Sequence, residues 1–376
     1  VIIRQLIDGP QNYRFTAEVF GYTFIVSFLT LSALMYLMAR AGALQRFRKH
    51  VRTPQRVIDE HFSTHPSSIT VLVPSYSEEV SVIRKTLLSA ALQEAQGLRV
   101  VLLLDDHPFK IRPQHKERIE QSRALGGEIE KLLSEPYLRA VNLHSSLKQS
   151  EFSDTKHCVT KIAEQYEQSA LWLENLANTE SIEDHVDVFF IEEVIKGLAS
   201  NLRRTKDEML SLREEGVEFS KDRLEQLCNR LIWTFGAKLD LFERKRYISL
   251  SHEANKAMNL NSYIGLMGGS YKKVQAPEGL ILMATKSGEE ADLIIPDSEY
   301  ILTLDADSVL LPEYCSRLVY FLEQPENADV GVVQTPYSSF RGAPSRLERL
   351  SGATTDIQHI IHQGMTYYNA TFWVGA

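Results

Sequence analysis

The sequence predicts an α/β protein whose mostly parallel sheet is interrupted by a long helical insertion and preceded by one transmembrane helix. Three observations carry this prediction. Short β-branched runs alternate with helical apolar periodicity in two parts of the chain, the interval between them is charged and helical, and an uncharged apolar segment lies near the N-terminus. Strands that alternate with helices are typical of parallel sheets in α/β proteins.

The apolar segment at residues 19–38 is predicted to cross a membrane, because it is uncharged over about the length that spans a bilayer core. A buried helix of a soluble domain is the alternative. Six basic residues and no acid follow the segment: Arg40, Arg46, Arg48, Lys49, Arg52 and Arg56. Positive charge favours the cytoplasmic side, so we expect an N-terminal segment (1–14), a transmembrane helix (15–43) in the plasma (inner) membrane, and a basic cytoplasmic linker (44–67).

The first soluble segment, residues 68–108, predicts a strand, a helix and a second strand. Residues 69–73 are a β-branched run ended by Pro74, and residues 98–104 are a second apolar run that ends in Asp105 and Asp106. The crossover in such a unit makes the two strands parallel. Both strands should therefore end at the same edge of one sheet.

The interval from 109 to 248 is charged, poor in Gly and Pro, and periodic at helical spacing. Three apolar stripes predict three long amphipathic helices, the last of which runs towards Leu241. We expect this insertion to fold as a separate helical hairpin or bundle that projects from the α/β domain. It would serve regulation or assembly, with a surface for a second copy or a protein partner.

After the insertion, residues 249–376 resume the strand and helix pattern. The stretch "YILTLDADS" (300–308) predicts a third parallel strand, which ends in Asp305 and Asp307. Residues 330–336 resemble a fourth strand, residues 347–368 a helix, and residues 369–376 a last strand. Within the helix, His359 and His362 are three apart, which is compatible with metal binding but more simply explained by an ordinary, partly buried pair.

Asp305 and Asp307 are the first candidate for chemistry. Carboxylates at the carboxyl end of a strand lie where open α/β sheets bind ligands. A divalent cation would relieve their mutual repulsion, and hard oxygen ligands suit Mg²⁺ or Mn²⁺. The alternative is a polar turn, in which Asp is common.

The composition limits the classes of function. The 376 residues are 44% hydrophobic and 24% charged, as in globular proteins. A net charge of −8 argues against a nucleic-acid partner, because proteins that bind the phosphate backbone of nucleic acids are usually basic. Cys158, Cys228 and Cys315 form no C-x-x-C pair, so we expect neither a disulfide framework nor a zinc site. This cysteine usage fits a reducing compartment.

Several short motifs occur in one order along residues 68–107 and 251–376: "VPSYSEE", "LLDDHP", "NKAMNLN", "TLDADS", "QTPYSSF" and "FWVGA". This order resembles the family 2 glycosyltransferases, nearer to membrane-bound processive synthases of the cellulose synthase type. The resemblance implies a GT-A fold, which is a Rossmann-like sheet, with halves at 68–108 and 249–376. It also implies an inverting enzyme that transfers a sugar from a UDP-sugar donor to a polysaccharide acceptor. By family frequency, the sugar is glucose and the product a β-glucan.

The resemblance also assigns roles to residues at the matching motif positions. Those implied in donor binding are Pro74, Tyr76, Glu78, Asp105, Asp106, Lys256, Asn259, Asn261 and Asp305. Tyr76 would face the uracil with Glu78 beside it, and Asp105, with Asp106, would bind the base or ribose. Lys256 would meet the diphosphate. Asp305 and Asp307 would hold Mg²⁺ or Mn²⁺, which stabilises the departing UDP. The acceptor side would include Gln334, Thr335 and Pro336.

The chain departs from the family pattern at three positions. Ser77 stands where the motif has Asn, His107 where it has Gly, and Met258 where it has Gly. The family's catalytic base and its Q-x-x-R-W motif are expected beyond Ala376. Two rival interpretations remain, namely a haloacid-dehalogenase-type phosphatase with Asp305 as nucleophile and a non-catalytic membrane scaffold. UDP binding that depends on Mn²⁺ would distinguish the transferase from both.

Overall fold

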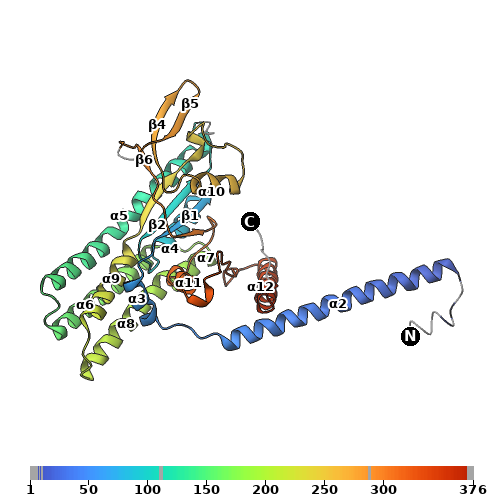
Figure 1. Ribbon diagram of the computed structural model, residues 1–376, viewed down its shortest axis with the longest axis horizontal. Helices are drawn as coiled ribbons and strands as arrows, with labels where there is room; N and C mark the ends of the chain where they lie inside the picture. Colours follow the sequence, from blue (N-terminus) through green and yellow to red (C-terminus); the bar gives the residue numbers. More distant parts are fainter. Residues whose placement is uncertain (1–6, 8, 10–11, 110–112, 287–288, 371–376) are drawn as a thin grey trace. The chain divides into compact units, whose positions relative to one another are not determined.

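The structure is a computed structural model that describes residues 7, 9, 12–109, 113–286 and 289–370 (Figure 1). The chain divides into two compact units. The larger unit comprises residues 53–333, and the smaller one comprises residues 1–52 together with 334–376. Each unit is described by itself below.

A four-stranded parallel sheet forms the centre of the larger unit. Its strands are β1 (Ile69–Ser75), β2 (Leu98–Leu104), β3 (Lys238–Phe242) and β7 (Tyr300–Thr303), in the order β3-β2-β1-β7. In the register, Val71 of β1 lies opposite Val100 of β2 and Leu302 of β7. The predicted α/β fold with a parallel sheet is confirmed.

The two central strands are buried on both faces, which explains their nearly continuous apolar sequence. Val71 and Val100 point into the larger core cluster. Leu72 and Val101 point the opposite way, into a second cluster that includes Tyr263. Successive side chains of a strand alternate between faces, so one apolar run supplies both cores.

A helical region covers one face of this sheet. It includes α4 (Val80–Ala91), α5 (Pro113–Gln149), α6 (Thr155–Thr179), α7 (His185–Phe189), the π-helix η1 (Phe190–Ile195), α8 (Lys196–Glu214) and α9 (Lys221–Phe235). Polar caps begin several of these helices. Asp154 accepts a hydrogen bond from the backbone of His157 (3.0 Å), and Ser220 accepts one from Arg223 (3.2 Å). Such caps satisfy the first backbone donors of a helix.

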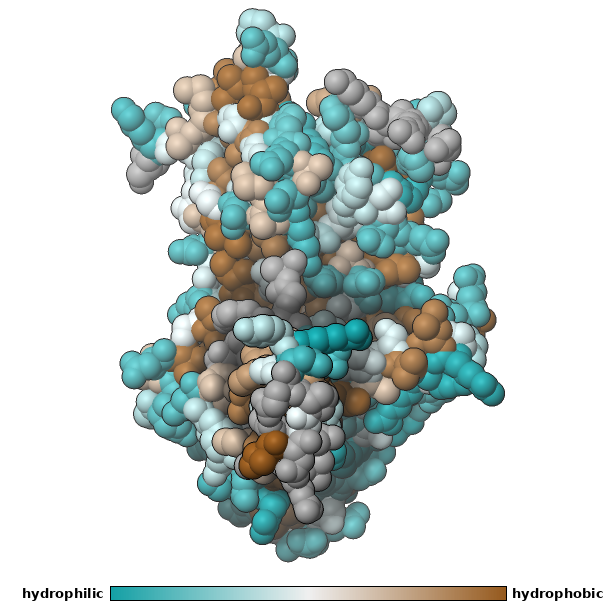
Figure 2. Space-filling model, turned by 90° about the vertical axis from the view of Figure 1, so that its right-hand side faces the viewer, coloured by the Kyte–Doolittle hydropathy of each residue, from teal (hydrophilic) through white to brown (hydrophobic). Residues whose placement is uncertain are grey.

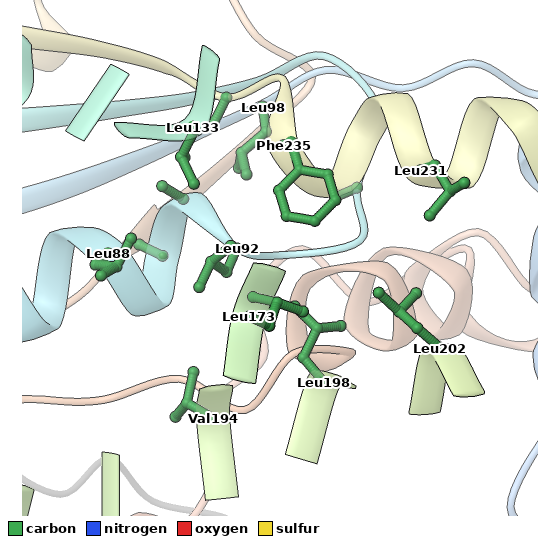
Figure 3. Packing of buried hydrophobic residues seen from close by; sticks show 14 of the residues in the cluster. Leu88, Leu92, Leu98, Leu133, Leu173, Val194, Leu198, Leu202, Leu231 and Phe235 are labelled. Atoms are coloured by element: carbon green, nitrogen blue, oxygen red, sulfur yellow. The ribbon is translucent and has the colours of Figure 1, made fainter. Parts of the chain in front are cut away.

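The helices after β2 share one hydrophobic core with α4 and the sheet. Figure 3 shows residues of α4, β2, α5, α6, η1, α8 and α9 gathered in this core, among them Leu88, Leu98, Leu133, Leu173 and Phe235. The expectation of a projecting, separately folded bundle therefore differs from the structure. The reason is that apolar stripes reveal which helix face is buried but not what covers it.

A buried ion pair reinforces this junction. Arg230 of α9 donates to Glu94, which follows α4, and the closest nitrogen–oxygen distance is 2.8 Å. Both side chains are almost completely buried. Burial raises the pKa of Glu94, and the guanidinium of Arg230 opposes that shift. Removing either partner would leave a buried charge uncompensated.

The chain re-enters the sheet within the interval expected to be helical. Gly236 follows the last residue of α9, and β3 begins two residues later. Leu241, which we expected near the end of a helical stripe, is therefore in a strand. The sequence KLDLF has only three apolar residues, of which just Leu239 and Leu241 alternate with polar ones, a signal too short to outweigh the helical periodicity before it.

Smaller elements complete this unit. They are α3 (Gln55–Thr64), η2 (Arg244–Arg246), α10 (Lys256–Ile264), β4 (Ser270–Ala276), β5 (Gly279–Ala284), β6 (Leu293–Ile294), α11 (Tyr314–Leu322) and η3 (Pro325–Asn327). Strands β4 and β5 form an antiparallel hairpin, with β6 on the other side of β4. Figure 2 shows apolar residues at the top of the view, the level at which this hairpin lies in Figure 1. Met283 of β5 is 54% exposed.

The fourth strand expected at residues 330–336 does not form, although the structure describes all seven residues. Val330 and Val332 are exposed instead. A β-branched run becomes a strand only where a neighbour offers backbone partners and a surface to pack on. Sequence alone does not reveal that residues 330–336 pair with no strand among the described residues.

The smaller unit contains α2 (Tyr13–Lys49) and α12 (Arg346–Tyr367). Within the described part of the chain, α2 is the one helix long and apolar enough to cross a membrane. Helix α12 confirms the helix predicted at residues 347–368. Residues 371–376, most of the last expected strand, lie outside the described residues.

Small residues allow α2 and α12 to approach closely. A Cβ at Gly42 would lie 2.6 Å from the carbonyl oxygen of Gly364, and a Cβ at Gly364 would overlap the backbone of Ala39. Arg46 of α2 donates a hydrogen bond to the carbonyl of Gln363 (3.2 Å). Interfaces of this kind need glycine or alanine at the crossing point.

Candidate functional site

The predicted polar segments lie together at the carboxyl edge of the parallel sheet. Two backbone hydrogen bonds prolong the strand pairing beyond the strands themselves. The amide of Asp105 donates to the carbonyl of Ser75 (2.9 Å), and that of Leu304 donates to Leu72 (3.0 Å). Three segments consequently follow adjacent strands at this edge: residues 76–78, 105–106 and 305–307.

The loop after β7 displays its two carboxylates on either side of a buried residue. Ala306 is buried, and its carbonyl accepts a hydrogen bond from the Thr86 hydroxyl of α4 (2.6 Å). Asp305 and Asp307 are both exposed. Helix α4 thus fixes Ala306, the middle residue of the D-x-D motif, and the two exposed acids lie on either side of it.

Helix α10 carries the predicted lysine to this loop. Asn255 caps the helix by accepting a hydrogen bond from Ala257 (2.8 Å), so Lys256 is its first residue. The ammonium of Lys256 forms an ion pair with Asp305, and both side chains are about half exposed. Met258 lies inside the helix. The glycine that the related motif has at this position is therefore not needed here for a left-handed turn.

The two predicted asparagines of α10 have different surroundings. The Asn259 amide is buried and donates to the carbonyl of Leu103 in β2 (2.9 Å). Its side-chain oxygen has no hydrogen-bond partner within the described part of the chain. Asn261 is exposed on the same helix. Asn259 thus fastens α10 to the end of β2.

Asp105 is engaged by cations that the sequence analysis did not include. Arg244 binds both of its carboxylate oxygens, at 2.6 and 3.0 Å, and its side chain is completely buried. Lys245 lies 3.2 Å from the same carboxylate and also donates to the backbone carbonyl of Asp105. Asp105 therefore anchors the segment after β3, and its expected contact with the base or ribose stays a prediction. The run "RKR" directly after a strand was the signal that could have pointed to these residues.

Tyr76 presents an open aromatic face beside this cluster. It follows β1, and 64% of its surface is exposed. The ammonium of Lys245 lies 5.6 Å from the ring centroid, a distance at which a cation is attracted to an aromatic face. Pro74 is part of β1, and Glu78 is exposed beyond the turn.

Asp106 belongs to a second cluster, which helix α5 completes. Its carboxylate accepts from the backbone amide of Ser77 (3.1 Å) and from the guanidinium of Arg118 (2.8 Å). One turn and a half further along α5, Arg123 pairs with the buried Glu243 at 2.7 Å. The helical region thus supplies two arginines to the sheet edge, which its amphipathic pattern alone did not predict.

The residues present are compatible with a divalent cation that a substrate helps to hold. Among the described residues, no three His, Cys, Asp or Glu side chains are already grouped to bind a metal. However, Mg²⁺ is often held by one or two carboxylates together with substrate phosphates. Asp305 and Asp307 provide exposed hard oxygen donors of this kind.

Two further sequence predictions concern other parts of the chain. Gln334, Thr335 and Pro336 belong to the smaller unit, and their expected role towards an acceptor stays a prediction. The three cysteines are free and buried. Burial raises the pKa of the Cys228 and Cys315 thiols to about 12.

Comparisons with known proteins give one match. No curated protein and no solved structure matches the chain. Residues 300–376 match the family described as glycosyl transferase family group 2. The matched region begins at β7 and includes the D-x-D motif and the Q-T-P stretch. This match supports a family 2 glycosyltransferase and indicates a glycosyltransferase enzyme.

Proposed function

We propose that the protein is a membrane-bound, inverting glycosyltransferase that transfers a sugar from a UDP-sugar to a growing polysaccharide. Glucose and a β-glucan are the expected sugar and product. One observation supports this most. The exposed carboxylates Asp305 and Asp307 lie at the carboxyl edge of a parallel sheet, and Lys256 contacts one of them. Such an edge is where open α/β sheets bind ligands.

In this proposal, the nucleoside part of the donor lies against Tyr76. The open ring offers a flat surface for the uracil, and Glu78 provides a polar group beside it. Asp106 supports the turn that carries Tyr76, and Asp105 secures Arg244 and Lys245 next to it. We therefore assign Asp105 a supporting role for the base pocket.

The diphosphate part of the donor lies between α10 and the D-x-D loop. Lys256 binds phosphate oxygens as a compact cation, and the N-terminal end of α10 favours negative charge. Asp305 and Asp307 would hold Mg²⁺ or Mn²⁺, which when bound would supply Lewis-acid stabilisation of the leaving UDP. In the ligand-free chain, the contact with Asp305 keeps Lys256 at this position.

The membrane location rests on α2. Its apolar residues are mostly exposed, as expected for a helix that faces lipid, and Arg46, Arg48 and Lys49 lie in its last turn. Positive charge at that end orients the enzyme domain towards the cytoplasm. Gln334, Thr335 and Pro336 are proposed to lie on the acceptor side, where the polysaccharide binds.

The decisive experiment measures UDP binding and sugar transfer by the full chain in detergent. We expect UDP to bind in the presence of Mn²⁺ and much more weakly after EDTA treatment, and label to pass from UDP-glucose to a polymer. Release of phosphate from a phosphomonoester without UDP binding would support the phosphatase alternative. A chain that neither binds UDP nor releases phosphate would favour the scaffold.

A further inference from the structure

The turn that carries Tyr76 has an unusual backbone. Ser77, the next residue, has φ = 62°, in the left-handed region that residues with a Cβ seldom adopt. A conformation of this kind persists only where its surroundings determine it, and it is found preferentially at functional sites. The contacts of Ser77 therefore decide how Tyr76 is presented.

Three hydrogen bonds hold Ser77 in this conformation. Its amide donates to Asp106 Oδ2 (3.1 Å), and its hydroxyl accepts from Arg118 Nη1 (2.9 Å). Arg118 Nη2 also donates to Asp106 Oδ1 (2.8 Å), which closes a triangle of three residues. Two of these bonds involve an ionised acceptor, and such bonds are stronger than neutral ones.

Arg118 is delivered by a helix that is itself firmly held. Residues Leu125, Ile129 and Leu133 of α5 are buried in the larger core cluster. Arg123, on the same helix, pairs with Glu243 at the end of β3. The guanidinium of Arg118 is thus attached to the core through its own helix, whereas Ser77 belongs to a loop.

We infer that Arg118 is a positioning residue for the donor, because it fixes the left-handed turn at Ser77 and thereby the direction of Tyr76. The helical region after β2 is then part of the nucleotide site. This inference rests on the proposed function, in which Tyr76 faces the uracil. It also predicts which part of the donor is affected, since the contact of Lys256 with the diphosphate does not pass through Ser77.

The test uses isothermal titration of the full chain in Mn²⁺ with two probes, UDP and inorganic pyrophosphate. Arg118→Met should weaken UDP binding about tenfold and leave pyrophosphate binding unchanged. Arg118→Lys, which keeps the charge but loses the planar fork, should give an intermediate loss of UDP affinity. Lys116→Met, an exposed change on the same helix, is the matched control and should bind both probes normally.

A second substitution checks the mechanism. Glycine adopts a positive φ readily, so Ser77→Gly in the Arg118→Met background should restore most of the lost UDP affinity. Three results would each overturn the inference. Arg118→Met could bind UDP normally, Arg118→Met and Arg118→Lys could lose affinity for UDP and pyrophosphate equally, or Ser77→Gly could fail to restore UDP affinity. Failure of the unmodified chain to bind UDP would instead overturn the proposed function, and the inference with it.

Discussion

Two pairs of acidic residues follow strands β2 and β7 of the parallel sheet, and the two pairs differ in burial. Asp105 and Asp106 are buried and bound by Arg244, Lys245 and Arg118. The pair after β7, in contrast, is exposed, and the ammonium that contacts its Asp305 is on the half-exposed Lys256. Aspartates at equivalent strand ends can therefore be buried in ion pairs that anchor other segments, or remain exposed.

The largest effect should follow removal of the open pair. Asp307→Ala should lower sugar transfer about a thousandfold, because a metal that stabilises the leaving group contributes several kcal/mol. Asp305→Ala should behave nearly as severely. Stability should change by less than about 0.5 kcal/mol, since an exposed carboxylate packs against little. Wild-type turnover by Asp307→Ala in the presence of EDTA would show that the loop does not act through a metal.

The buried pair should show the reverse behaviour. Asp105→Ala leaves the guanidinium of Arg244 buried without its partner, so we expect a loss of about 3–5 kcal/mol in the free energy of unfolding. Denaturant titration of the detergent-solubilised chain, followed by tryptophan fluorescence, measures it. A stable Asp105→Ala protein that has lost only UDP binding would return Asp105 to the direct role first expected from its motif.

Lys256 separates the two parts of the donor. Lys256→Ala should weaken UDP binding about tenfold, the loss expected for a charge-assisted contact with phosphate. Binding of uridine should stay almost unchanged, because uridine has no phosphate. Titration with both ligands decides the point, and equal losses for the two would contradict the assignment.

The smallest effect concerns the ion pair between Lys256 and Asp305. Because both side chains are about half exposed, the pair should contribute less than about 1 kcal/mol to the stability of the ligand-free chain. A double-mutant cycle on the unfolding free energy measures this coupling. A coupling as large as that expected for Asp105 and Arg244 would mean that the loop after β7 is also a structural anchor.

The sequence was sufficient for three strands of the parallel sheet, β1, β2 and β7, and for the open acidic loop. Residues 69–73 and 98–104 are nearly continuous apolar runs, interrupted at Thr70 and Arg99, and polar residues follow soon after each, so the local pattern predicts both the strand and its end. Parallel crossovers then place these ends at one edge without knowledge of any side-chain contact. The D-x-D motif at 305–307 could be located for the same reason.

The remaining features depend on contacts between residues far apart in the chain. Asp105 and Arg244 are 139 residues apart, and no periodicity connects them. The helical pattern before β3 obscured that strand, and the run at 330–336 has no pairing strand in the part of the chain that the structure describes. The local sequence pattern predicts helices and strands, whereas long-range contacts decide which polar side chains already have a partner.

The close crossing of α2 and α12 has a consequence for biosynthesis. Gly42 and Gly364 meet backbone to backbone, yet about 320 residues separate them. At typical rates of translation, Gly364 is made roughly 15 to 65 seconds after Gly42. During that interval the small-residue face of α2 has no partner from its own chain. The helix pair can therefore form only after Gly364 has been made, long after the synthesis of α2 itself.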